Sequence, residues 1–265
     1  MKTMNRTALI TGASAGIGAE FARFLASEGY SLLLVARRAD RLQEMATALA
    51  AQYHVRCDVF AADLTDPKAP AAIMHYANEQ NIQIDILINN AGLSGKSAFA
   101  TTSWQTLGAE IQLMVTAVTE LCHLVLPNMR AKGWGRIINL SSIAAFSPPG
   151  ASLLYTGIKS YVLNISQSLD MELKPQGIHV TALCPGFTHS EFHDTMGTRR
   201  QADKLPSFLW QEPQDVVREG WAAVMKGKPV CVPGTVNKVM ASSVRPLPVK
   251  LQYFLGNTLN PFKQH

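Results

Sequence analysis

Residues 11–18 read Thr-Gly-Ala-Ser-Ala-Gly-Ile-Gly, and they directly follow the short β-rich run Thr7–Thr11. Apolar residues then recur at helical spacing over Ile17–Ser27. Glycines let the backbone turn tightly and approach a phosphate, and the following helix offers unpaired N–H groups and the positive end of its dipole. A strand, a glycine turn and a helix in this order predict a site for the pyrophosphate of a dinucleotide. The residues of this turn that are expected to bind the dinucleotide are Gly12, Ser14, Ala15, Gly16, Ile17 and Gly18.

Short apolar runs alternate with helical stretches along the rest of the chain. The run Tyr30–Ala36 is continuously apolar, as in a strand buried on both faces. Seven candidate strands follow this reading: Thr7–Thr11, Tyr30–Ala36, Val55–Ala61, Ile84–Asn89, Arg136–Ser141, Ile178–Cys184 and Pro229–Val232. Strand–helix alternation predicts an α/β, single-domain Rossmann fold, with a doubly wound seven-stranded parallel sheet and helices on both faces.

The helices between these strands have less certain ends. Ser103–Lys132 has one long helical pattern, Ser152–Lys174 another, and Asp66-Pro67 resembles a helix start. We expect residues 1–235 to form the dinucleotide-binding and catalytic domain, with a substrate loop at about 187–211. Residues 236–265 are expected to form a C-terminal extension.

Composition excludes several classes of protein. The 265 residues are 47% hydrophobic and 16% charged, which argues against a disordered or fibrous chain. The net charge of +5 is scattered, without a run of five basic residues, so we expect no nucleic-acid partner. The four cysteines are far apart, as in buried reduced thiols, and no apolar run approaches the ~18 residues of a membrane span. We expect a cytoplasmic protein.

Histidine and glutamate at His189, Glu191 and His193 are the nearest approach to a metal-binding cluster. Alternation along an extended loop explains them better, because no cysteine pair or HExxH spacing supports a metal site. We expect no metal.

The second predicted strand ends in Val35-Ala36-Arg37-Arg38. A carboxylate at this point would bond the ribose 2′-hydroxyl of NAD, whereas guanidinium groups bind a 2′-phosphate. Arg37 and Arg38 therefore predict NADP(H), and the Ser14 hydroxyl could contact the same phosphate.

Tyr155 and Lys159 are four residues apart in a predicted helix, so they share one face. A nearby ammonium favours phenolate and should lower the pKa of the tyrosine, which can then exchange a proton with a carbonyl or alcohol oxygen. Ser142 lies just past a predicted strand, where parallel α/β sheets bind ligands, and its hydroxyl can bond the same oxygen. Ser142, Tyr155 and Lys159 are the predicted catalytic residues.

Six motifs resemble the short-chain dehydrogenase/reductase superfamily, in its order and spacing, over about residues 5–235. They are Thr11-Gly12-x3-Gly16-Ile17-Gly18, Asp63-Leu64, Asn89-Asn90-Ala91-Gly92, Ser141-Ser142, Tyr155-x3-Lys159 and Pro185-Gly186. The resemblance implies an NADP(H)-dependent oxidoreductase that transfers a hydride between the nicotinamide and a ketone, aldehyde or secondary alcohol.

The resemblance also implies further cofactor contacts. Lys159 would bond the nicotinamide ribose, next to Tyr155. The remaining contacts it implies are Asp63, Leu64, Asn90, Ala91, Gly92, Pro185, Gly186, Phe187 and Thr188. Members of the family usually form homodimers or homotetramers. The apolar stripe of Met114, Ala117, Leu121, Leu124 and Val125 fits such an interface, although core packing explains it too.

One position departs from the family pattern. The family's helix asparagine, which usually holds a water in a proton relay to the lysine, aligns with Met114. A thioether cannot replace that amide. The alternative function is thus a catalytically weak or silent NADP-binding sensor or scaffold.

The expected substrate is a small hydrophobic carbonyl or alcohol, in contact with Ser142, Phe146, Leu153, Tyr155 and Phe187. The tail after residue 235 combines apolar and basic side chains. It could pack on the domain, pack on a partner subunit, or make a weak peripheral membrane contact.

Overall fold

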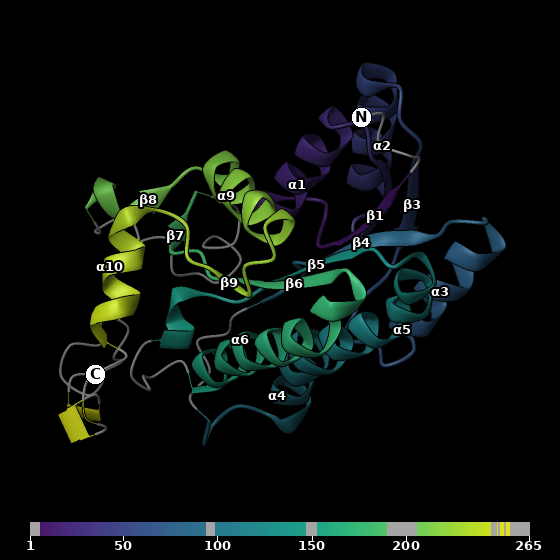
Figure 1. The fold of residues 1–265 in the computed structure, drawn as a ribbon. Coiled ribbons are helices and arrows are strands. Elements are labelled where there is room, and N and C mark those ends of the chain that lie inside the picture. The colour runs from purple at the N-terminus through teal and green to yellow at the C-terminus, as the bar shows by residue number, and fades with distance from the viewer. Residues whose placement is uncertain are drawn as a thin grey trace.

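The computed structural model describes residues 6–93, 99–146, 153–189, 206–244, 248, 250, 251, 253 and 254. Its central sheet has seven parallel strands in the order β3-β2-β1-β4-β5-β6-β9 (Figure 1). The strands are β1 (Thr7–Thr11), β2 (Ser31–Ala36), β3 (Cys57–Ala61), β4 (Ile84–Asn89), β5 (Gly135–Leu140), β6 (Ile178–Leu183) and β9 (Val230–Cys231). The predicted Rossmann fold is confirmed, and each predicted strand is present.

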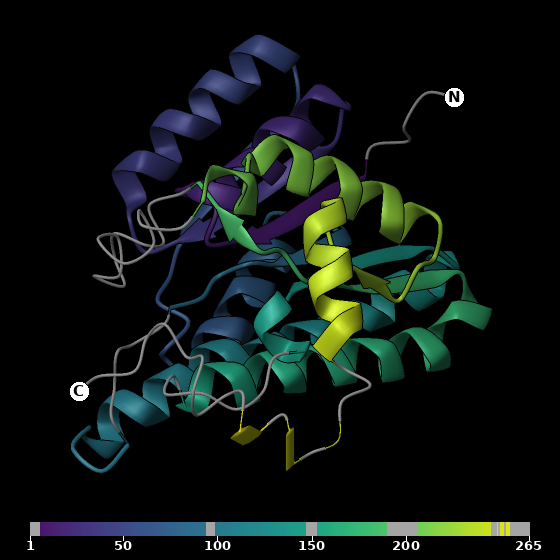
Figure 2. The ribbon, with the colours of Figure 1, turned by 90° about the vertical axis from the view of Figure 1, so that its left-hand side faces the viewer.

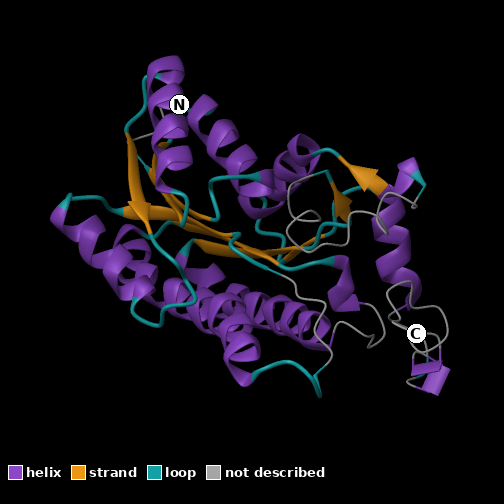
Figure 3. Ribbon diagram, turned by 180° about the vertical axis from the view of Figure 1, so that it is seen from behind, coloured by secondary structure: helices purple, strands orange, loops and turns teal. Residues whose placement is uncertain are grey.

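Helices cover both faces of the sheet (Figure 3). On one face lie α1 (Gly16–Ser27), α2 (Ala39–Tyr53) and α9 (Pro213–Met225). On the other lie α3 (Ala69–Glu79), α5 (Ala117–Lys132) and α6 (Leu153–Leu173). Successive strand residues point to opposite layers, so Leu32 and Leu34 pack on the first layer and Leu33 and Val35 on the second. This double burial explains the continuous apolar run of β2.

The long predicted helix over 103–132 is interrupted. It consists of α4 (Trp104–Ile111), a π-helical turn over Gln112–Thr116, and α5. Trp104–Lys132 is long and apolar enough to cross a membrane by length and composition, but half of its most apolar window is buried inside the protein. Met114, Ala117, Leu121 and Val125 are all buried against the sheet, so the apolar stripe packs mainly in the core of the subunit.

Three local features differ from the sequence predictions. Helix α3 begins at Ala69, with Pro70 in its first turn, because Asp66 instead closes a turn in which its Oδ1 accepts a hydrogen bond from the Lys68 N–H at 2.9 Å. Two short strands, β7 (Phe187–Thr188) and β8 (Trp210–Gln211), form a small parallel sheet beside the domain. Helix α10 (Thr235–Val244) starts the C-terminal extension.

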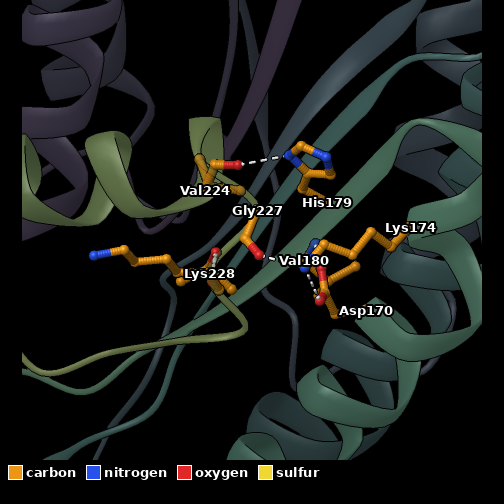
Figure 4. Close-up of polar contacts among 8 residues, drawn as sticks. Asp170, Lys174, His179, Val180, Val224, Gly227 and Lys228 are labelled. Carbon is orange, nitrogen blue, oxygen red and sulfur yellow. Dashed lines mark hydrogen bonds and ion pairs between the residues drawn. The ribbon is translucent and has the colours of Figure 1, made fainter.

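Polar contacts fix the amino-terminal edge of β6 (Figure 4). Asp170 at the end of α6 accepts hydrogen bonds from the Val180 N–H, at 3.0 Å, and from Lys174 Nζ, at 3.2 Å. His179 Nδ1 lies 3.0 Å from the carbonyl oxygen of Val224 in α9. These bonds connect α6 and α9 to the same strand, near its amino-terminal end. The site lies at the opposite side of the sheet, at the carboxyl ends of the strands.

Candidate active site

The predicted site residues meet at the carboxyl edge of the sheet. The glycine turn follows β1, Arg37 and Arg38 follow β2, and Ser142 lies just past β5. Asp63 and Leu64 follow β3, Asn90–Gly92 follow β4, and Pro185–Thr188 follow β6. Because all the strands are parallel, segments far apart in sequence come together where such sheets bind ligands.

Asn90 holds the glycine turn closed. Its Nδ2 donates hydrogen bonds to the carbonyl oxygens of Thr11, at 3.0 Å, and Gly12, at 3.2 Å. A Cβ on Gly18 would lie 2.4 Å from both the Gly12 oxygen and Asn90 Nδ2, and Gly12 itself has φ +66°. Side chains are therefore excluded where the turn, Asn90 and helix α1 meet. The Asn90 side chain therefore braces the turn.

The amino terminus of α1 is suited to an anion. Its first residue follows Ala15, no side chain in the described ranges caps it, and its first turn contains no acidic residue. Its N–H groups and the positive end of its dipole are thus available to a phosphate. A hollow lies in front of this helix end, lined by Ser14, Ala15 and Gly16 on one side and by His189 and Glu212 on the other.

Arg38 lies over the glycine turn. Its Nη2 and Nε donate hydrogen bonds to Oγ of Ser14, at 3.1 and 3.3 Å. The guanidinium and the hydroxyl therefore lie side by side at the glycine turn. Arg37 points differently: its Nη1 is 3.8 Å from Oδ2 of Asp63. Leu64, beside Asp63, is buried. The predicted pair of arginines therefore separates, and Arg38 with Ser14 makes the better phosphate site.

Ser142, Tyr155 and Lys159 come together beyond β5. The Tyr155 phenol and the Ser142 side chain share a hydrogen bond, and Ser142 Oγ also accepts the N–H of Ala144 at 3.1 Å. Lys159 is 6% exposed, and its Nζ lies 5.5 Å from the centroid of the Tyr155 ring. The fold thus brings these three residues together in one polar cluster.

The ionisation of this cluster differs from the prediction. Burial raises the pKa of Tyr155 to about 12, and the hydrogen bond with Ser142 offsets only part of that effect. Burial lowers the pKa of Lys159 to about 8. The expected lowering of the Tyr155 pKa is therefore wrong for the protein chain by itself, because burial of the phenol is the dominant effect. The Lys159 ammonium donates a hydrogen bond to the carbonyl oxygen of Leu140, at 2.7 Å.

Met114 and Lys159 both approach Gly92. A Cβ placed on Gly92 would be 3.6 Å from Met114 Sδ and 4.0 Å from Lys159 Nζ. Met114 is 1% exposed and sits in the π-helical turn, a feature often found at functional sites. An apolar thioether therefore occupies the neighbourhood in which the family keeps an amide.

The predicted substrate contacts are only partly placed. Phe146 packs near Leu163 and Cys184, and the ring of Phe187 lies 5.8 Å from that of Trp210. The side chain of Leu153, Glu191, His193 and most of the predicted substrate loop lie outside the described residues. Among the residues described, no cluster of His, Cys, Asp or Glu could hold a metal ion.

Sequence reasoning missed two contacts at this edge. The ring of His189 stacks on Trp210, with centroids 4.6 Å apart. Asn237 of α10 is 3% exposed and contacts Gly186 so closely that a Cβ there would lie 2.5 Å from its Oδ1. Neither pair has a local sequence signal, since its members are 21 and 51 residues apart. The sequence predicts buried, unpaired cysteines. All four thiols are free, and Cys122, Cys184 and Cys231 are buried.

Comparison with known proteins finds a family match and close structural relatives. The model of the family described as short chain dehydrogenase matches residues 6–201. A probable NADP-dependent dehydrogenase of Haemophilus influenzae is 35% identical over 223 residues, which are 82% of this chain and 85% of that protein.

Two solved structures share both fold and sequence. A short-chain dehydrogenase from Sphingobium yanoikuyae in complex with NADPH is 32% identical, with a TM-score of 0.80, over 92% of this chain and 96% of that one. A bulky-bulky ketone specific alcohol dehydrogenase from Comamonas testosteroni is 31% identical, with a TM-score of 0.76, over 92% and 95% of the two chains.

Proposed function

This chain belongs to the short-chain dehydrogenase family of oxidoreductases, and we propose that it transfers a hydride between NADP(H) and a ketone, aldehyde or secondary alcohol. The observation that carries the proposal is the cluster of Ser142, Tyr155 and Lys159, assembled at the same edge of the sheet as the glycine turn. The likeness to a dehydrogenase in complex with NADPH supports the same cofactor here.

The chain's own groups fit NADP(H) at two points. The uncapped end of α1 suits the pyrophosphate, and Arg38 with Ser14 suits a 2′-phosphate. When bound, the cofactor supplies or accepts the hydride. In this proposal Lys159 would bond the nicotinamide ribose, and the Pro185–Thr188 segment would lie beside the nicotinamide.

Tyr155 is the proposed proton donor in reduction and acceptor in oxidation. Ser142 shares a hydrogen bond with the phenol, so an oxygen bound between them would accept one bond from each hydroxyl. A phenol whose pKa is about 12 in the protein alone is a donor at neutral pH, which suits carbonyl reduction. Oxidation requires a positive charge nearby, which Lys159 and the nicotinamide of NADP⁺ would provide.

The proposed substrate is a hydrophobic carbonyl compound or alcohol. Phe146 ends the short helix that follows Ser142, Phe187 and Trp210 form an aromatic pair after β6, and one structural relative is described as specific for bulky-bulky ketones. The alternative of a silent NADP-binding sensor is not favoured, because the polar cluster is complete and Met114 remains its only support.

The test is NADPH consumption by the purified protein with a panel of apolar ketones and aldehydes. Tyr155→Phe should lower kcat about 10²–10⁴-fold with little change in NADPH affinity. Tyr161→Phe is the matched control, because that tyrosine is on the same helix but 37% exposed and bonded to Thr119. Near-normal turnover in Tyr155→Phe would refute the assigned role.

We also propose a homodimer or homotetramer that uses the α4–α6 surface. Trp104 on α4 is 73% exposed and Met171 on α6 is 77% exposed, which is unusual for side chains this large and apolar. Light scattering of the wild type and of Trp104→Glu tests the proposal. The variant should have a lower molar mass in solution than the wild type, and a monomeric wild type would contradict the proposal.

A further inference from the structure

Charge is unevenly distributed along this chain. All 19 acidic residues precede residue 220, whereas residues 235–265, from the start of α10 onward, contain four basic residues. The C-terminal part therefore carries the positive surplus, while the rest is close to neutral. A segment of this kind is attracted to anionic surfaces.

Helix α10 has one buried and one exposed apolar face. Asn237 and Ala241, one turn apart, are 3% and 8% exposed and pack on the domain. Another face carries apolar side chains at i, i+3 and i+4, namely Val236, Val239 and Met240, which are 40%, 61% and 40% exposed.

More exposed apolar side chains follow the helix. Leu251, Tyr253 and Phe254 are 41%, 68% and 61% exposed, next to the exposed Lys250. Figures 1 and 2 both place residues 250–254 beyond the C-terminal end of α10. We call Val236, Val239, Met240, Leu251, Tyr253 and Phe254 the C-terminal apolar face.

The buried side of α10 adjoins the candidate active site. Helix α10 contacts the short helix Ile143–Phe146, which directly follows Ser142, and Asn237 packs on Gly186. Helix α10 therefore lies between the C-terminal apolar face and the segments that flank Ser142.

We propose that the C-terminal apolar face binds the surface of an anionic lipid bilayer. Apolar side chains can enter the boundary between headgroups and acyl chains, while nearby basic residues add electrostatic attraction of about 1 kcal/mol each. A second copy of the chain is a poorer occupant, because a symmetric contact would bring the two positive surpluses together. A nucleic acid would leave the apolar side chains without partners.

Docking in this way has a consequence for the substrate. It would bring helix α10, which packs beside the segment that follows Ser142, next to lipid, where an apolar ketone or alcohol is concentrated. This consequence rests on the proposed function, whereas the docking itself does not, and the two are tested separately.

The test is co-sedimentation of the full chain with vesicles. Wild-type protein should bind vesicles that contain phosphatidylglycerol, bind pure phosphatidylcholine more weakly, and dissociate as salt rises. The double variant Val239→Ser, Met240→Ser should bind at least about tenfold more weakly, since two exposed apolar side chains are lost. Lys250→Ala should weaken binding about fivefold.

Lys228→Ala is the matched control. Lys228 lies at the turn before β9, on the opposite edge of the sheet, and its side chain extends away from the polar contacts around it (Figure 4). The Lys228→Ala substitution removes one positive charge, as Lys250→Ala does, and should leave vesicle binding unchanged. Lys250 is used rather than Lys238, because Lys238 already pairs with Glu219 at 2.9 Å.

Three results would overturn the proposal. They are failure of the wild type to bind anionic vesicles, equal losses for Lys250→Ala and Lys228→Ala, and a serine double variant that changes only the oligomeric mass. The last result would assign the face to a second copy. Since none of these readouts depends on turnover, NADPH consumption remains a separate measure of the proposed function.

Discussion

The ammonium of Lys159 donates a hydrogen bond to the carbonyl oxygen of Leu140, 2.7 Å away, at a position where the lysine is 6% exposed. Burial lowers the pKa of Lys159 from 10.5 to about 8. The folded protein therefore carries an unfavourable buried charge below pH 8. As the pH rises from about 8 to 10.5, the folded form releases this proton while the unfolded form keeps it, so the cost disappears and stability increases.

We accordingly predict that Lys159→Met abolishes turnover but stabilises the fold at neutral pH. The shift corresponds to about 3 kcal/mol, from which the loss of the bond to Leu140 subtracts, so a net gain of about 1–2 kcal/mol is expected. Thermal unfolding at pH 7 and pH 10 measures it, with the exposed Lys228→Met as control. The gap from wild type should narrow at pH 10, and a gap that widens there would contradict the argument.

Arg38 should decide the choice of cofactor. Its guanidinium is held at Ser14 Oγ, whereas Arg37 is turned toward Asp63, so only Arg38 is placed beside the glycine turn. Charge-assisted hydrogen bonds to a phosphate contribute about 1.5–3 kcal/mol. Arg38→Leu should therefore raise the KM for NADPH about 10–100-fold and leave that for NADH nearly unchanged.

The KM for NADPH of two related variants should be compared with that of Arg38→Leu in the same steady-state assay. Ser14→Ala should have a smaller effect of the same kind, and Arg37→Leu a smaller effect still. If Arg38→Leu raises the KM for NADPH and NADH equally, the guanidinium does not recognise the 2′-phosphate.

The sheet could be predicted because its strands are buried on both faces and therefore read as apolar runs, as at Ser31–Ala36. The position of the site could be predicted because its residues directly follow those strands in the sequence, as Ser142 follows β5. In both cases the signal is local in sequence, and parallel topology then determines which edge of the sheet the residues share.

Other features depend on packing between distant segments. The brace from Asn90 to Gly12 joins residues 78 positions apart, and the π-helical turn around Met114 has no residue pattern of its own. The sequence predicts the wrong direction for the pKa of Tyr155, because the spacing shows the nearby lysine but not the burial of the phenol.

Met114→Asn should raise kcat several-fold. An amide near Gly92 and Lys159 could hold a water next to the ammonium, which the thioether cannot. Burying the amide should also lower the free energy of unfolding by about 1–3 kcal/mol. Single-turnover rates together with thermal unfolding separate the two effects. Met114→Leu, which stays apolar, should show no rate increase, and an unchanged rate in Met114→Asn would mean that proton relay does not limit turnover.

Glu110 should make stability fall as pH rises. It is 4% exposed, its Oε1 has no hydrogen-bond partner, and burial raises its pKa above the ordinary 4.5. As the pH rises through 4.5, the unfolded chain loses this proton before the folded protein does, so the unfolded state is favoured until the raised pKa is also passed. Glu110→Gln stays neutral and should therefore be more stable than wild type at pH 7, with the gap closing near pH 4. Denaturant unfolding at the two pH values measures this, with the exposed Glu44→Gln as control. A gap that is the same at both pH values would show that ionisation of Glu110 does not limit stability.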